Sequence, residues 1–238
     1  MNEYPNDAAE FFLRGGFPGG QEEASERELQ YAGAEVAIEK IHKGETRNIP
    51  FGKHTWRVLS HYKLHYKNEQ GECVLLLAEH SFDDCHYHAL SKKVTWESSY
   101  MRQHLNTVFL NEFDAYDQEY ILPTRNDNPA NPWFGTDGGN DTLDRVFLLS
   151  IQEVFHYFGG SRKKVIKKSD HWIDDRHNVN RIATDYDGMA KGWWLRSPGR
   201  AGNLAACVCE DGRLWLNGWG VRCSLVSGIR PALWLNLS

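Results

Sequence analysis

Three histidines and a cysteine lie close together in the sequence and are the nearest candidates for a metal site: His80, Cys85, His86 and His88. Imidazole and thiolate are the common ligands of zinc. However, His86 and His88 alternate on an extended segment, and His80 lies beyond a turn, so their spacing does not predict converging ligands. We therefore expect no bound metal and no cofactor.

A second group of polar residues could supply oxygen ligands to calcium, which binds six to eight of them. The spacing is not that of an EF-hand. Turn-forming Asp and Asn residues would give the same composition, so a calcium site and an ordinary loop are both compatible with it. The residues are Asp127, Asp137, Asn140, Asp141 and Asp144.

Two cysteines, Cys207 and Cys209, would place their thiols on the same face of a strand. An exposed dithiol or a copper-type site is one interpretation, and a pair of small surface residues is the other. The second is favoured because no histidine follows His177 to act as a base or a further ligand. The odd total of five cysteines, without CxxC spacing, indicates free thiols in a reducing compartment.

The segment 199–228 combines arginine, tryptophan and glycine in short strands. Alternation along 213–219 directs Arg213, Trp215, Asn217 and Trp219 to one face and the intervening leucines to the other. If the leucine face is core, the segment displays Trp and Arg, the residue types that dominate binding hot spots. If the tryptophan face is core, the segment displays no Trp and Arg surface. Periodicity alone does not decide which of the two faces is buried.

Short strands and two helices are predicted to position these residues. Residues 55–59 and 73–78 have strand patterns, with a hairpin around 68–71 between them. A helix follows Ser98 or Ser99, because Met101, Leu105 and Val108 recur at helical spacing.

A second helix follows the apolar run 146–149, which we interpret as a buried strand. Ser150 and Glu153 form a capping box, and Gly159 and Gly160 end the helix. Residues 126–144 are rich in Asn, Asp, Gly and Pro and are predicted to be a loop.

The last part of the chain has strand patterns over 193–196, 205–209, 213–217 and 232–235, with a hairpin signal at Asp211 and Gly212. Strands do not alternate with long helices, so a parallel sheet is not expected. The sequence predicts an α+β fold of mixed short antiparallel strands with two helices and long loops. Residues 1–43 are expected to be a loosely packed lead-in, and residues 44–238 the domain.

The 238 residues carry 27 Lys and Arg against 32 Asp and Glu, and the resulting net charge of −5 argues against a nucleic-acid binder. The sequence contains neither a long apolar span nor a basic, apolar leader, so we expect no membrane insertion and a cytoplasmic or virion-associated protein. Hydrolase, nucleotide-binding and kinase motifs are absent, which favours a protein that is not an enzyme.

Two blocks near the end resemble a known family. Residues 193–199 (WWLRSPG) and 228–235 (GIRPALWL) are similar to the C-terminal signature of a bacterial and phage family of unknown biochemical function. Its members include variable proteins of diversity-generating retroelements. Residues 56–59, 95–106 and 144–150 are similar to upstream blocks of that family, so the resemblance extends over about residues 48–237.

The resemblance implies a C-type-lectin-like fold whose C-terminal strands and loops display a ligand-binding surface. In diversified members, a reverse transcriptase copies a template with errors at adenines and replaces the matching part of the gene. Randomised Asn codons can encode Arg, Ala, Gly, Leu, Cys, Ser or Val, but not Trp or Glu. On this reading the variable region is about residues 200–227.

Most residues of that region can be reached from an Asn codon, including Leu216, while Trp215, Trp219 and Glu210 cannot and are either fixed or derived from another codon. A fixed framework would comprise Ala205, Ala206, Val208, Asp211, Gly212, Gly218, Val221 and Gly228. The candidate ligand-binding residues are Arg200, Ala201, Gly202, Asn203, Leu204, Cys207, Cys209, Arg213, Trp215, Asn217, Trp219, Arg222, Cys223, Ser224, Leu225, Val226 and Ser227.

The sequence thus favours a non-enzymatic, receptor-type protein with a hypervariable surface and a protein as its ligand. One alternative is an oxidase similar to formylglycine-generating enzymes, using Cys207 and Cys209. The other is an undiversified structural protein of a virion. Arg196 and Arg230 lie between apolar neighbours and are expected to make buried hydrogen bonds.

Overall fold

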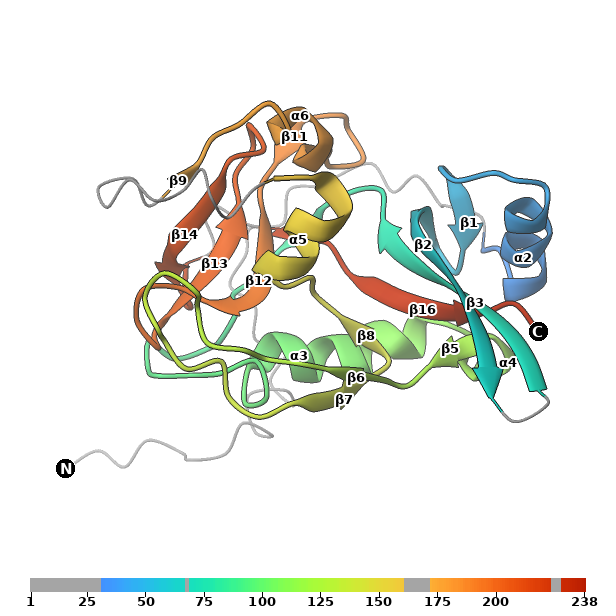
Figure 1. The fold of residues 1–238 in the computed structure, drawn as a ribbon, viewed down its shortest axis with the longest axis horizontal. Helices are drawn as coiled ribbons and strands as arrows, with labels where there is room; N and C mark the ends of the chain where they lie inside the picture. Colours follow the sequence, from blue (N-terminus) through green and yellow to red (C-terminus); the bar gives the residue numbers. More distant parts are fainter. Residues whose placement is uncertain (1–30, 67–68, 161–171, 224–227) are drawn as a thin grey trace.

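The structure is a computed structural model that describes residues 31–66, 69–160, 172–223 and 228–238. Two sheets organise this part of the chain (Figure 1). Most of the paired strands are antiparallel, and helices and long loops connect them, so the fold is α+β as predicted.

The first sheet is built on a long hairpin of β2 (His54–Tyr66) and β3 (Glu69–Ala78), which confirms the predicted pairing. Its order is β1-β2-β3-β16-β5, and β8 also pairs with β16. The last strand therefore lies beside an early one, as the red and teal arrows of Figure 1 show. The other bounds are β1 (Ile49–Phe51), β5 (Ile121–Leu122), β8 (Val146–Phe147) and β16 (Ala232–Asn236).

The second sheet carries the candidate binding residues and has the order β4-β15-β12-β13-β14-β9. Its central strand β12 pairs antiparallel with β13 and parallel with β15. Gly212, with a positive φ of 79°, lies in the predicted hairpin between β13 and β14. The bounds are β4 (Phe82–Asp84), β9 (Trp172–Ile173), β12 (Trp193–Pro198), β13 (Leu204–Val208), β14 (Leu214–Gly220) and β15 (Gly228–Ile229).

Arg230 holds the two sheets together where the chain passes from β15 to β16. Its side chain is completely buried, and Nε donates to the carbonyl of Ala78 at 2.9 Å. The guanidinium also lies 5.1 Å from the ring centre of Trp193. The expected buried hydrogen bonds of Arg230 are therefore confirmed: they attach the connection between β15 and β16 to β3 of the first sheet, and the ring contact reaches Trp193 of β12 in the second.

The helices are more numerous than the two that were predicted. Ser150 and Glu153 form the predicted capping box of α5 (Ile151–Phe158), which packs against β12, and Ser99 caps α3 (Tyr100–His104). Short helical segments follow α3 as η1 (Leu105–Phe109) and η2 (Leu110–Glu112). The additional helices are α2 (Ala34–His42), α4 (Ala115–Tyr120) and α6 (Asn178–Arg181).

Two sequence expectations about helices need correction. Val108 is exposed, with 47% of its surface accessible, because η1 is a π-helical turn and Phe109 follows Leu105 on the buried side instead. Residues 34–42 also differ from the loose lead-in expected over 1–43, since Ala34, Ala37 and Ile41 are buried in the core. The remainder of that lead-in, up to residue 30, lies outside the described residues.

The predicted loop over residues 126–144 is largely irregular, but its ends pair as β6 (Thr124–Asn126) and β7 (Thr142–Asp144). A second small ribbon joins β10 (Ala183–Thr184) to β11 (Ala190–Lys191). None of the helices in the described part of the chain is long and apolar enough to cross a membrane.

Candidate functional site

Strand β14 separates a buried leucine face from a partly exposed face of tryptophan and arginine. Leu214 and Leu216 are buried at 0% and 1% exposure, which decides the question that periodicity left open. Arg213, Trp215 and Asn217 are half-buried, and Trp219 is exposed. The leucines therefore belong to the core, and Leu216 is not a surface position although an Asn codon could encode it.

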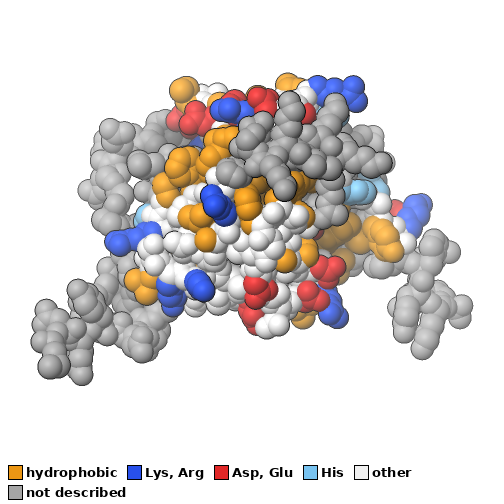
Figure 2. All heavy atoms as spheres, turned by 60° about the vertical axis from the view of Figure 1, so that its left-hand side comes forward, with side chains coloured by type: hydrophobic (Ala, Val, Ile, Leu, Met, Phe, Trp, Pro, Cys, Tyr) orange, Lys and Arg blue, Asp and Glu red, His pale blue; other side chains and the backbone are white. Residues whose placement is uncertain are grey.

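An aromatic row runs along the outer edge of this sheet. The ring centre of Trp172, in β9, lies 3.6 Å from that of Trp215, and the ring centre of Trp219 lies 5.9 Å from that of Trp215 on the row. Arg213 stacks 4.7 Å above Trp172 and also pairs with Asp211 at 2.6 Å. Figure 2 turns this side of the molecule forward and shows hydrophobic side chains gathered there beside isolated Lys or Arg side chains.

Trp172 was missed by the sequence analysis. It lies in a polar segment well before the variable region, and only the pairing of β9 with β14 brings it to Trp215. A two-residue strand carries no periodic signal, so its partner could not be inferred from the sequence. The aromatic row therefore combines Trp215 and Trp219 of the proposed variable region with Trp172, which lies outside it.

Backbone hydrogen bonds gather the rest of the candidate surface at one end of β14. The Arg200 amide donates to the Asn217 carbonyl at 2.7 Å, and the Val221 amide donates to the Asn203 carbonyl at 3.0 Å. Arg200, Ala201 and Arg222 are exposed, and Gly202, Asn203, Leu204 and Cys223 are half-buried. The loop 199–204 and the end of β14 thus form one continuous accessible region.

The cysteines correct part of the predicted surface. Cys207 is completely buried, because its register places it between Trp194 of β12 and Trp215 of β14. Cys209, just after the strand, is half-buried. Cys207 is therefore a core residue and not a ligand-binding one. Ser224, Leu225, Val226 and Ser227 lie outside the described residues.

Asn131 holds the loop that contains Arg200 through hydrogen bonds to its backbone and to β14. Its buried Nδ2 donates to the carbonyls of Pro198 at 2.8 Å and Leu216 at 3.3 Å. Beside it, the Thr136 hydroxyl donates to the Arg200 carbonyl at 2.8 Å. These bonds hold the backbone of the loop and leave the side chain of Arg200 uninvolved, so the loop position does not depend on the identity of residue 200.

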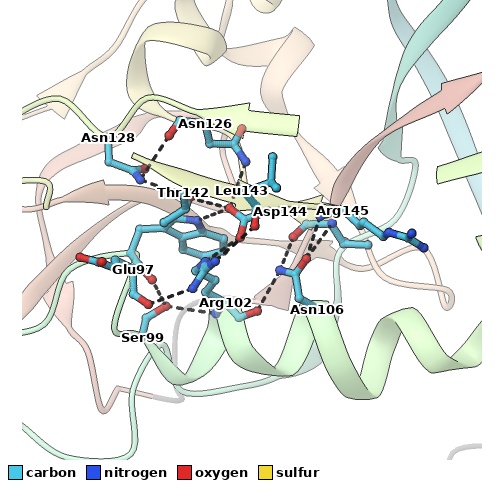
Figure 3. Close-up of polar contacts among 12 residues, drawn as sticks. Glu97, Ser99, Arg102, Asn106, Asn126, Asn128, Thr142, Leu143, Asp144 and Arg145 are labelled. Atoms are coloured by element: carbon cyan, nitrogen blue, oxygen red, sulfur yellow. Dashed lines mark hydrogen bonds and ion pairs between the residues drawn. The ribbon is translucent and has the colours of Figure 1, made fainter. Parts of the chain in front are cut away.

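Asp144 is the centre of a polar network that fixes this supporting loop (Figure 3). Its buried carboxylate accepts from Trp96 Nε1 at 3.0 Å, from the Thr142 hydroxyl at 2.7 Å and from Arg102 Nε at 2.6 Å. Asn126 Nδ2 donates to the same carboxylate at 3.0 Å. With so many protein donors, Asp144 acts here as a structural acceptor.

Three of the other four proposed calcium ligands also have protein partners for their side chains, and the Asp127 carbonyl accepts from Arg196 at 3.2 Å. Asp141 pairs with Arg125 at 2.7 Å, Asp137 accepts from the Gly139 amide at 3.0 Å, and Asn140 donates to Glu97 at 3.0 Å. Among the residues that the structure describes, His, Cys, Asp and Glu side chains nowhere gather in threes as metal ligands. The loop interpretation therefore accounts for these residues.

The histidines and the cysteine of the zinc candidate point to different partners. His88 Nδ1 accepts from the Tyr100 amide at 3.2 Å, and Cys85 Sγ donates to the His86 carbonyl at 3.4 Å. The His80 ring packs at a tilt against Tyr186, with ring centres 4.8 Å apart. Burial lowers the pKa of His88 below its ordinary value, so this imidazole is a neutral acceptor at pH 7.

Buried polar contacts fix β12 beneath the candidate surface. Arg196 donates to the Leu148 carbonyl at 2.9 Å and pairs with Glu153, as was expected for this residue. The hydroxyl of Tyr87 donates to the Arg196 carbonyl at 3.1 Å. Burial raises the pKa of Tyr87 above its ordinary value, so the phenol stays protonated and remains a donor.

Glycines divide the candidate region into positions that accept a side chain and positions that do not. A Cβ at Gly218, which has φ of 76°, would lie 2.3 Å from the Ala205 carbonyl oxygen. A Cβ at Gly212 would lie 2.0 Å from the Asn178 carbonyl oxygen, and one at Gly199 would lie 2.1 Å from that of Asn217. At Gly202, the nearest atom would be Lys93 Cγ at 3.2 Å, on a flexible exposed side chain.

These features define an α+β protein in which a buried frame of tryptophan, arginine and asparagine supports an accessible region around β14. The chain belongs to the family described as Domain of unknown function (DUF6273), whose match covers residues 71–237. Neither a curated protein nor a solved structure is significantly similar to the chain.

Proposed function

We propose that this protein is a non-enzymatic, receptor-type binding protein whose surface within residues 200–227 is varied by a diversity-generating retroelement. Its scaffold would be the C-type-lectin-like fold that the C-terminal signature implies. The ligand would be a protein, since Trp219, Arg200 and Arg222 offer the residue types that dominate protein interfaces on an accessible region.

The observation that carries this proposal is the steric division of the region. Most positions assigned to a fixed framework are buried or closed to a side chain: Ala205, Ala206, Val208 and Val221 are at most 1% exposed, and a Cβ at Gly212 or Gly218 would meet backbone. Asp211 is the exception, because it is exposed. Among the described residues, the positions assigned to variation are exposed or half-buried, with Cys207 and Leu216 as the exceptions. A substitution at a buried or closed position disturbs the fold, whereas a substitution at an accessible position leaves the fold intact.

The test is the DNA beside the gene. We expect a template repeat that matches the codons for about residues 200–227 and differs from them mainly at adenines, together with a reverse transcriptase gene. Codons for Trp172 and Asn131 should lie outside the repeat. A matching segment with differences spread over all four bases would refute the proposal, and so would the lack of any repeat.

The oxidase alternative is weakened by the position of Cys207. An oxidase of that kind needs two thiols that substrate can reach, whereas Cys207 is completely buried between its strand neighbours Trp194 and Trp215. The second alternative, a virion structural protein, would also have buried and accessible positions, so the sequences of relatives must decide it. A relative with an identical segment 200–227 on a divergent scaffold would favour that alternative.

A further inference from the structure

A cavity of about 290 Å³ opens beside the loop 199–204, at the edge of the candidate surface. It is smaller than the 300 to 1,000 Å³ of typical small-molecule sites, so it suits a single side chain better than a whole ligand. Six of its residues come from outside the proposed variable region, and Gly202 is the seventh. The lining consists of Lys93, Val94, Thr95, Ser98, Thr136, Asp137 and Gly202.

Residue 202 faces Lys93 across the lining, so a side chain at this position would take up part of the cavity. The backbone φ of Gly202 lies outside the left-handed region, so larger residues can adopt it. A Cβ at this position would approach Lys93 Cγ to 3.2 Å, and a longer side chain would extend along the lining. The Gly202 carbonyl accepts from the Val94 amide at 2.8 Å, which holds the loop against the cavity whatever side chain is present.

The lining offers one donor and one acceptor that remain available. Lys93 is exposed and makes no ion pair with any other described residue, so its three N–H groups are free to donate. Asp137 Oδ1 accepts from the Gly139 amide, and Oδ2 has no hydrogen bond within the described part of the chain. The hydroxyls of Thr95 and Ser98 lie 3.3 Å apart and bond to each other.

On these grounds we propose that the cavity binds a carboxamide, such as an Asn or Gln side chain of the protein ligand, with Gly202 deciding whether it is open. The amide oxygen would accept from Lys93, and the amide N–H₂ would donate to Asp137. A carboxylate would pair with Lys93 but leave Asp137 without a donor, and an ammonium would pair with Asp137 but leave Lys93 without an acceptor. A carboxamide supplies both an acceptor and a donor. No aromatic residue is among those described around the cavity, so a sugar ring would find no face to stack on. This inference rests on the proposed function.

The test is a titration of the full-length, ¹⁵N-labelled protein with acetamide, followed by amide chemical shifts. We expect saturable shifts at Val94, Thr95 and Gly202 in the millimolar range. Acetate, methylammonium and methyl α-glucoside serve as matched probes and should shift these amides at least threefold less. If any of the three produces shifts as large as acetamide, or if acetamide produces none, the inference is wrong.

Variants of the lining provide controls that keep the fold. Asp137→Asn retains the Oδ1 acceptor for Gly139 but replaces the available oxygen with a donor, so it should weaken acetamide binding at least threefold. Gly202→Leu should abolish the shifts by filling the cavity. Unchanged binding in both variants would overturn the inference. The result is independent of the DNA test, because a template repeat without acetamide binding would refute the cavity and leave the proposed function standing.

Discussion

Replacing Gly218 by alanine tests the division between closed and open positions most sharply. The left-handed φ of 76° costs a residue with a Cβ about 1–2 kcal/mol. The Cβ would also lie 2.3 Å from the Ala205 carbonyl oxygen, so β13 and β14 must separate locally. Weakening one or two of their hydrogen bonds costs about 1 kcal/mol each. We therefore expect Gly218→Ala to lower the free energy of unfolding by about 3 kcal/mol.

The matched variant is Gly202→Ala, the same chemical change in the same region. Its backbone accepts alanine, and the flexible Lys93 side chain can move by the few tenths of an ångström required. Lower entropy of the unfolded chain favours the variant by about 0.4–1 kcal/mol, so its stability should stay within about 1 kcal/mol of the parent.

Urea unfolding followed by circular dichroism measures both variants, and thermal unfolding supports it. For a chain of this length, about 3 kcal/mol corresponds to a Tm lower by about 6–12 °C. The reasoning is refuted if Gly218→Ala is as stable as the parent, or if Gly202→Ala loses as much stability as Gly218→Ala.

Three further predictions concern the frame. Asp144→Asn should cost about 3 kcal/mol of unfolding free energy by urea denaturation, because it leaves Arg102 without its carboxylate. Asp141→Asn removes an exposed ion pair with Arg125 and should leave the unfolding free energy almost unchanged, so equal losses in the two variants would contradict the network. Burial alone raises the pKa of Glu79, but Arg57 outweighs it and holds the pKa below its ordinary value. The pair therefore contributes stability above about pH 4.3, and this contribution is lost as the pH falls through the folded pKa. Glu79→Gln should flatten this acid limb of the stability profile, and an unchanged limb would refute the assignment. Iodoacetamide should label Cys209 and Cys223 in the folded protein and Cys207 only after unfolding, as peptide mass spectrometry would show; equal labelling of Cys207 would disprove its burial.

Local patterns in the sequence predicted the elements that local interactions determine. The capping box at Ser150, the cap at Ser99 and the hairpin at Gly212 all depend on neighbouring residues, and the structure has each of them. The α+β class followed from the same short-range signals. The arrangement of the strands into two sheets joined at Arg230 depends on long-range pairing and was not predictable from them.

The candidate surface was predictable only in part, for the same reason. Alternation identified the two faces of β14 but not which one was buried, since that depends on what packs against each. The burial of Cys207 follows from its neighbours in β12 and β14, and the position of Trp172 follows from the pairing of β9. Asn131 and Asp144 resembled ordinary loop residues, and only their distant partners reveal them as supports.

The most direct measurement compares two libraries of this protein displayed on yeast and selected for protease resistance. One library randomises the accessible positions with codons that an altered Asn codon can reach, and the other applies the same codons to an equal number of framework positions. The first library covers Arg200, Ala201, Asn203, Asn217 and Arg222, and the second covers Ala205, Ala206, Val208, Gly218 and Val221. We expect most members of the first library and few of the second to remain folded, whereas equal survival would contradict a fixed frame that carries a replaceable surface.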